Sequence, residues 1–468
     1  MSAYKFKNIL SSDISFNFSK TVKHVANLNS SALTALICAL YQDNDVPLLV
    51  ICADSVDAHT LLRTLKAIVK RDDIYFFQDW ETLPYDPISP HQDIISSRLK
   101  LLSSLKDLKK GIILTTVPAI MPRLCPVEYI KKNSFSIKIG DRRNIEKMKS
   151  EFVSYGYLKV QQVLSPGEFA IRGSILDIFP MGSALPYRID FFDDEVDSIK
   201  TFDLDTQRSV ESIKEIAMLP AHEFPLDDTA ISAFRSNYRD EFVGANLANH
   251  TIYQAVSRGA IPAGIEYYLP LFFHHMSSLF EYLSDDVKII LIDDVKKALE
   301  DYDVDIHKRA LDYAGNNDHP PLKPEKVFLT TLECQNFIKD HESICLYKER
   351  FDEETTEKRG YYNASFEKVP EIAFNQDKDS HGPFVAFVSD FIDKGGRILI
   401  SAVSEGRRQS VREILPSALV NKYGIKPASS LEEFMSEDAP LMLTISPFDE
   451  GLIIKNLKLC LITESELY

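Results

Sequence analysis

The sequence predicts an α/β fold, and three features of its pattern support this prediction. Short apolar runs alternate with amphipathic segments through the first part of the chain. The run "VPLLVICAD" (46–54) is apolar at almost every position, which is typical of a parallel strand buried on both faces. The apolar residues of the following segment, 55–73, have helical spacing. Regular alternation of this kind favours a parallel sheet covered by helices.

The remaining elements of this first lobe follow the same two patterns. Segments with helical periodicity or an N-cap signal predict helices over 30–44, 55–73 and 91–111. Apolar runs of strand length predict strands over 46–54, 73–80 and 111–121. Ser55 is the expected N-cap of the second helix.

The pattern changes near residue 126. Between there and about residue 215, strand-like alternation and turn residues predominate, and Asp193, Asp194 and Glu195 are the expected hairpin turn. Helices and a buried strand then return. We therefore predict a discontinuous lobe, 1–126 and 216–340, with a small α+β domain, 127–215, inserted in it.

A second, smaller α/β domain is predicted over 341–468. The charge-rich stretch "LYKERFDEETTEKRGYYN" (346–363) indicates a solvated loop or linker. Beyond it, a helix closed by two glycines, a buried strand and a helix with Ser404 as its N-cap repeat the α/β pattern. The ending "LITESELY" places a strand against the terminus, which favours a piece of a longer protein.

Composition narrows the function classes. A formal net charge of −16 disfavours binding of nucleic acid by the chain as a whole, since phosphates would be repelled on average. Six scattered cysteines without ligand spacing predict buried, reduced thiols and no metal site. No signal peptide and no apolar run near the roughly 20 residues of a membrane span are seen. These features predict a cytoplasmic protein that does not contact a membrane.

The place where a nucleotide-binding lobe would hold phosphate is altered. A working phosphate loop needs glycines, a lysine and a Ser or Thr hydroxyl before its first core helix. Between Val25 and Leu40 there is neither glycine nor lysine, and Asn29, Ser30 and Ser31 stand there instead. The sequence predicts a degenerate loop, no nucleotide cofactor and no ATP hydrolysis. The rivals are a nucleotide-dependent DNA helicase or translocase lobe and a DNA-binding module.

No catalytic residue is predicted, because no nucleophile or metal-protease signature occurs. The strand "PYRIDFF" (186–192) raises a different question. Arg188 and Phe192 share one face with Asp190, because side chains alternate along a strand. Either this face docks a partner, or Arg188 and Arg172 form salt bridges within the domain, with Asp190 or Asp177. Simple parity places Arg172 with Leu176 and Ile178, so a bend near Gly173 would be needed to bring it onto the Arg188 face.

Four stretches together resemble a known family. They are "DWETLPYDPISPHQDIISSRL" (79–99), "GEFAIRGSILDIFPMGSALPYRIDFFDDEVDSIKTFD" (167–203), "LPAHEFP" (219–225) and "GIEYYLPLFF" (264–273). In this order they resemble the N-terminal half of the bacterial transcription-repair coupling factors. The resemblance implies UvrB-like domains: a degenerate RecA-like motor lobe with an inserted small α+β domain. It also implies that the ATP- and magnesium-dependent DNA translocase and the RNA polymerase-binding module lie outside this chain.

The resemblance further implies a partner and its contacts. Family members recruit UvrA, a subunit of the excision nuclease, through two arginines and an aromatic residue of the inserted domain. The matching positions are Arg172, Arg188 and Phe192. The family's C-terminal domain masks this face, so a chain without it is expected to bind UvrA constitutively. Arg188→Glu is expected to weaken UvrA binding without unfolding the domain.

The role of the domain over 341–468 stays open. The turn "FDEGLII" (448–454) resembles a late motif of helicase-like second lobes, with aspartate where an arginine would stand. This domain is therefore either a decayed second motor lobe or an unrelated α/β domain with a chance match.

Overall fold

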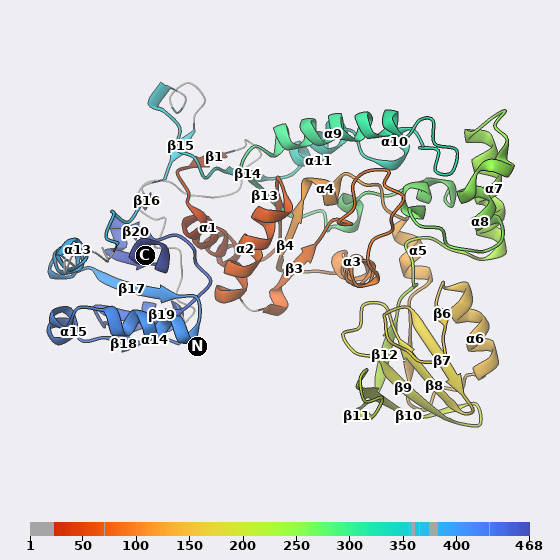
Figure 1. Cartoon of the computed structure of the whole chain (residues 1–468), viewed down its shortest axis with the longest axis horizontal. Helices are drawn as coiled ribbons and strands as arrows, with labels where there is room; N and C mark the ends of the chain where they lie inside the picture. Colours follow the sequence, from red (N-terminus) through yellow and green to blue (C-terminus); the bar gives the residue numbers. More distant parts are fainter. Residues whose placement is uncertain are drawn as a thin grey trace.

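The computed structural model shows three units of regular structure joined along one chain (Figure 1). It describes residues 23–69, 71–354, 356, 361–364, 366–373, 382–429 and 431–468. A parallel sheet with its helices forms the middle, a β-rich unit lies at one end, and a smaller α/β unit lies at the other (Figure 1). The predicted α/β class is confirmed.

The central unit is built on a seven-stranded sheet in which every neighbouring pair is parallel. Its strand order is β15-β1-β14-β13-β2-β4-β3. The strands are β1 (Lys23–Ala26), β2 (Pro47–Cys52), β3 (Ile74–Phe77), β4 (Gly111–Thr116), β13 (Lys288–Ile292), β14 (Ser343–Leu346) and β15 (Tyr362–Asn363). Every residue of β2 and β4 is buried, as the all-apolar runs predicted.

Helices cover this sheet, and their starts follow from capping chemistry. They are α1 (Ser30–Asp43), α2 (Ser55–Ile68), α3 (Gln92–Leu105), α9 (Val295–Asp312) and α11 (Thr331–Asp340). The N-cap of α2 is Asp54, whose carboxylate accepts from the Asp57 amide, so the prediction of Ser55 was wrong by one residue. A carboxylate caps a helix start as well as a hydroxyl does and also interacts with the helix dipole.

The central sheet extends beyond residue 340. Strands β14 and β15 both follow that residue, and both pair in parallel with β1. Much of the charge-rich stretch 346–363 therefore connects two strands of one sheet. Its last described residues, Tyr362 and Asn363, form β15 itself, where the sequence had predicted a loop or linker. A two-residue strand is too short to produce a periodic signal.

The β-rich unit contains a six-stranded sheet with the order β11-β10-β9-β8-β7-β6. Its strands are β6 (Leu158–Lys159), β7 (Glu168–Arg172), β8 (Ile175–Phe179), β9 (Tyr187–Phe192), β10 (Glu195–Phe202) and β11 (Ser209–Ile213). Neighbours are antiparallel except β6 and β7. The pair β5 (Phe135–Lys138) and β12 (Glu215–Met218) joins the unit to the lobe. The turn is present at Asp193 and Asp194, whereas Glu195, the third residue predicted for it, is the first residue of β10.

Helix α6 (Ile145–Ser154) covers one face of the six-stranded sheet. Its buried residues Met148 and Phe152 belong to the same apolar cluster as Phe169 and Ile189 of the sheet. The Phe152 and Phe169 ring centroids are 5.4 Å apart. The opposite face has only a small apolar cluster at one end, formed by Val163, Ala170, Phe179 and Phe202. One face is thus core, and the rest of the other face is largely polar.

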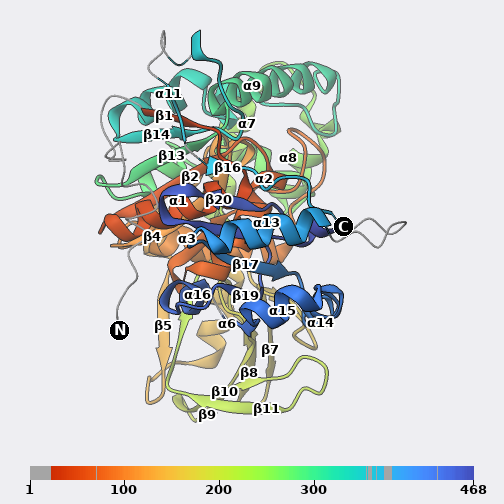
Figure 2. The same ribbon diagram turned by 90° about the vertical axis from the view of Figure 1, so that its left-hand side faces the viewer.

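The third unit is a six-stranded mixed sheet with the order β16-β20-β21-β17-β19-β18. Its strands are β16 (Phe366–Glu367), β17 (Arg397–Ala402), β18 (Lys426–Pro427), β19 (Leu441–Ile445), β20 (Leu452–Ile454) and β21 (Leu459–Ile462). Its helices are α13 (Gly382–Asp393), α14 (Glu405–Ile414), α15 (Ser417–Tyr423) and α16 (Leu431–Ser436). Figure 2 views the molecule from the end at which this unit lies. Ser404 caps α14, as predicted.

Two clusters hold the third unit together and to the lobe. One lies within the unit. The other is shared, because Leu399 and Met442 of the unit join Leu36 of α1 in one buried cluster. All six cysteines are free and buried, as predicted. Across the described ranges no helix has the length and apolarity to cross a bilayer.

One buried carboxyl gives the lobe a pH dependence. Glu266 is 7% exposed, and burial raises the pKa of its carboxyl to about 7. The folded lobe therefore binds this proton more tightly than the unfolded chain, and its stability falls as pH rises from about 4.5 to 7. We expect Glu266→Gln to raise the local free energy of unfolding at pH 8 by about 1–2 kcal/mol and to change little at pH 4.5. Hydrogen exchange of the lobe at both pH values measures this, and an equal effect at both would contradict it.

Candidate docking face

Alternation along β9 separates a buried side from a solvent side. Ile189 and Phe191 are buried in the core under α6, at 0% and 5% exposure. Arg188, Asp190 and Phe192 lie on the other side, as parity predicted. The Phe192 ring is 75% exposed, a high value for an aromatic residue within a strand. We call the side that carries Arg188 and Phe192 the docking face.

Arg188 is held in place by Asp177 of the neighbouring strand. The two residues are directly paired in the β8–β9 register. Arg188 Nε donates to Asp177 Oδ1 at 2.7 Å, and Nη2 donates to Oδ2 at 2.9 Å. Nη1 donates to the Gln207 carbonyl at 3.1 Å, and the guanidinium lies 5.0 Å from the centroid of the Phe202 ring. The hydrogen bonds to Asp177 raise the pKa of Arg188.

For Arg188 the structure shows the salt bridge within the domain that the sequence offered beside the docking of a partner. Asp177, not Asp190, is the partner of Arg188. The Asp177 side chain is 3% exposed and that of Arg188 is 20% exposed, so the pair is largely desolvated. Removing one member of such a pair leaves the other charge buried without its counter-charge. Arg188→Glu would place two carboxylates together, so we now expect it to destabilise the sheet, contrary to the sequence-based expectation.

Arg172 reaches the same face without a bulge. It ends β7 and is paired with Ile175 across the two-residue turn at Gly173 and Ser174. A two-residue turn puts residues i and i+3 on the same side, so this turn is the bend near Gly173 that the sequence required for Arg172 to reach the face. Gly173 has φ +64°, a conformation that favours glycine. The Arg172 side chain is 56% exposed, with Nη2 3.4 Å from Asp177 Oδ2.

The three predicted residues therefore lie on one face, and the two arginines both contact Asp177. Sequence reasoning treated this aspartate only as an alternative salt-bridge partner and missed its organising position between two arginines. Arg172 and Phe192 also lie at the same end of the sheet, because β7 and β9 run in the same direction and the Phe191 amide donates to the Ser174 carbonyl at 3.0 Å. The face offers an exposed ring, the exposed guanidinium of Arg172 and the guanidinium of Arg188, which Asp177 holds in place.

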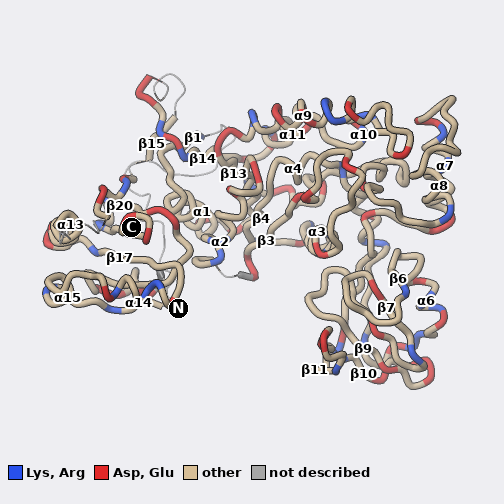
Figure 3. The backbone as a smooth tube through the Cα atoms, viewed as in Figure 1, with Lys and Arg blue, Asp and Glu red and all other residues tan. Residues whose placement is uncertain are grey.

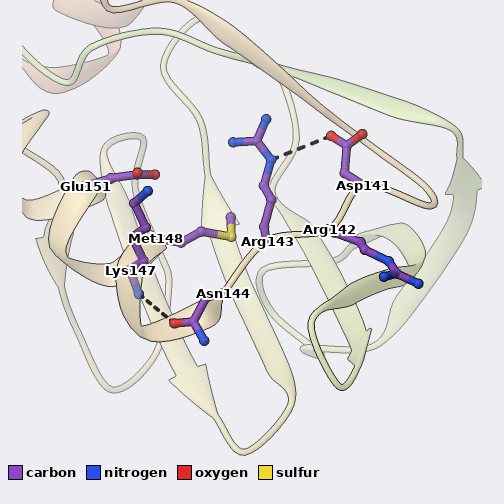
Figure 4. Close-up of a pocket in the computed structure, with 7 residues that line it drawn as sticks. All are labelled: Asp141, Arg142, Arg143, Asn144, Lys147, Met148 and Glu151. Atoms are coloured by element: carbon purple, nitrogen blue, oxygen red, sulfur yellow. Dashed lines mark hydrogen bonds and ion pairs between the residues drawn. The ribbon is translucent and has the colours of Figure 1, made fainter.

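A polar cavity lies beside this end of the sheet. It measures about 390 Å³ and is bordered by the segment before α6 and the first turns of that helix. Figure 4 shows its lining residues, Asp141, Arg142, Arg143, Asn144, Lys147, Met148 and Glu151. Asn144 caps α6 by accepting from the Glu146 and Lys147 amides. Its side chain also donates to Asp194 at 3.3 Å, which ties the cavity wall to the β9–β10 turn.

The start of α1, where phosphate would lie in a nucleotide-binding lobe, is filled by the third unit. The Ser30 amide donates to Glu450 Oε2 at 2.8 Å, and Ser31 Oγ donates to the Glu450 carbonyl at 2.6 Å. Asn29 caps α1, and its Nδ2 donates to the Gly451 carbonyl at 2.7 Å. A carboxylate thus takes the anion position that helix N-termini favour.

The Glu450 contact can be tested by amide exchange. Glu450→Ala removes a charge-assisted acceptor from the first turn of α1, so we expect the Ser30 amide to exchange about tenfold faster. Asp438→Ala is the matched control, because this exposed carboxylate lies on the same unit. Unchanged exchange at Ser30 in the Glu450 variant would show that the contact does not hold the two units together.

Within the described ranges, no group of three or more His, Cys, Asp or Glu residues has the geometry to hold a metal ion. Acidic and basic residues are interspersed along the backbone (Figure 3), so the negative charge is not gathered on one unit.

Comparison with known proteins identifies the family. Residues 135–224 match the family described as the UvrB interaction domain, and residues 387–467 match the MFD, D3 domain. Transcription-repair-coupling factors of Haemophilus influenzae and Escherichia coli are 38% and 35% identical to this chain over 447 and 445 residues. The chain matches the N-terminal region of transcription-repair coupling factors. It spans 38% of the length of either relative, and 95% of this chain is aligned. The UvrB interaction domain match contains all strands of the docking face.

Proposed function

We propose that this chain is a non-enzymatic adaptor region that recruits UvrA to stalled RNA polymerase. The observation that carries the proposal is the 75% exposed Phe192 ring on the same sheet face as Arg172 and Arg188, within the UvrB interaction domain match. Exposed aromatic and arginine side chains are the usual anchors of protein interfaces. UvrA is the partner implied by the family, and the cytoplasm is where the two would meet.

The proposal assigns the central unit to a degenerate RecA-like motor lobe, with the β-rich unit inserted in it. Two observations support this assignment: a parallel sheet whose strands come from both sides of the β-rich unit, and Glu450 at the start of α1. A nucleotide would have to displace that carboxylate. We accordingly propose that this region neither binds ATP with magnesium nor hydrolyses ATP, and does not act as a helicase or translocase lobe.

The rest of the proposal concerns parts of the family outside this chain. RNA polymerase and DNA are contacted there, and a C-terminal domain masks the docking face until polymerase is engaged. The third unit keeps its two alternatives, a decayed second motor lobe or an unrelated α/β domain. Its contact with α1 supports a role in blocking the start of that helix.

Direct titration tests the proposal. UvrA is titrated into the wild-type chain and into Phe192→Ala and Arg172→Gln variants, with binding followed by calorimetry. We expect saturable UvrA binding by the wild-type chain and weaker binding by both variants. The two side chains are exposed and are not part of the hydrophobic core. Absence of binding by the wild-type chain would overturn the proposed function. ATP titration in parallel should give no heat of binding.

A further inference from the structure

Arg142 lies on the docking face, although it belongs to the segment before α6 and not to the sheet. This segment runs beside the start of β10. The Arg143 amide donates to the Asp194 carbonyl at 2.6 Å, and the Val196 amide donates to the Asp141 carbonyl at 2.9 Å. The resulting antiparallel bridge pairs Arg142 with Glu195.

A row of paired residues connects Arg142 to Phe192. Glu195 is the partner of Arg142 on one side and of Phe192 on the other. Directly paired residues in antiparallel strands project from the same face. Two strand spacings therefore separate Arg142 from Phe192, about 10 Å. Arg172 lies two strands from β9 in the other direction, across β8.

The Arg142 side chain is free to meet a partner. It is 84% exposed, and its contact with Glu195 is long, with Nε 3.7 Å from Oε2. Figure 4 shows its guanidinium turned away from Arg143 and the other residues around the cavity. Arg143 is much less exposed, at 30%, and packs over Phe135. Of these two neighbouring arginines, Arg142 is the one presented to solvent.

We propose that Arg142 is a fourth contact of the docking face. The arrangement then has an exposed ring with a guanidinium on each side, Arg142 and Arg172. It fits a partner surface with an apolar socket for Phe192 and carboxylates on both rims. This inference rests on the proposed function, because it takes the partner to be UvrA. It adds a contact that the three family positions do not include.

Two neutralising variants separate a direct contact from a structural role. Arg142→Gln should weaken UvrA binding about tenfold, because a guanidinium that meets carboxylates is lost. Glu195→Gln should leave binding unchanged or strengthen it, because it releases Arg142 and removes a negative charge facing the acidic rim. Lys159→Gln is the control: Lys159 is exposed but is paired with Phe169 on the opposite, α6-covered face.

The outcomes are distinct. Arg142→Gln without effect, in a titration where Phe192→Ala loses binding, would overturn this inference and leave the proposed function standing. Equal losses in Arg142→Gln and Glu195→Gln would also overturn it, because the pair would then matter only through its ion pair. Wild-type chain that fails to bind UvrA would overturn both.

Discussion

Phe192→Ala is expected to weaken UvrA binding about thirtyfold or more, and to leave the fold unchanged. Truncating an interface anchor typically costs about 2 kcal/mol or more. The ring is 75% exposed in the free chain, so its removal leaves no cavity in the core. A drop in affinity without loss of amide protection in β9 would therefore identify a direct contact.

The matched control for Phe192 is another exposed apolar residue of the same unit. Val153 on α6 is 54% exposed and lies on the covered side of the sheet. Val153→Ala should leave the UvrA affinity within twofold of the wild-type value. An equal loss for both variants would mean that the measured change reflects the unit as a whole and not the docking face.

Asp177→Ala is expected to destabilise the six-stranded sheet by about 3 kcal/mol. The substitution leaves the Arg188 guanidinium, 20% exposed, without the carboxylate that accepts two of its hydrogen bonds. Arg172 loses its contact as well. Because the chain has several units, a single unfolding free energy is not defined, so the change is read from hydrogen exchange in β8 and β9. Asp190 lies on the same face. Asp190→Ala should change the opening free energy, measured by exchange in β8 and β9, by less than about 0.5 kcal/mol.

Replacing the whole pair separates stability from binding. The double variant Asp177→Leu, Arg188→Met substitutes apolar side chains of similar volume for both charges. Such replacements are often neutral or stabilising, so exchange in β8 and β9 should return close to that of the wild-type chain. UvrA binding by the double variant should be weaker than binding by the wild-type chain, because the guanidinium of Arg188 is gone. Restored affinity in this double variant would show that Arg188 only maintains the sheet.

The strands of the central unit could be predicted because a strand buried on both faces needs apolar side chains at most of its positions, as in β2 and β4. Short edge strands such as β15 carry no such signal and were assigned to a loop. The shared face of Arg188 and Phe192 followed from parity within one strand. The position of Arg172 did not, because parity changes across a two-residue turn. Contacts between distant segments, such as Arg142 with Glu195 or Glu450 with Ser30, depend on tertiary pairing. No local sequence pattern predicts them.

The most direct test of the docking face is hydrogen exchange of the chain with and without saturating UvrA. If UvrA docks on this face, protection should rise at the β7–β8 turn around Gly173 and at the β9–β10 turn around Asp193. The α13 helix of the third unit should be unaffected. Protection confined to the third unit or to the lobe, with both turns unchanged, would contradict the account.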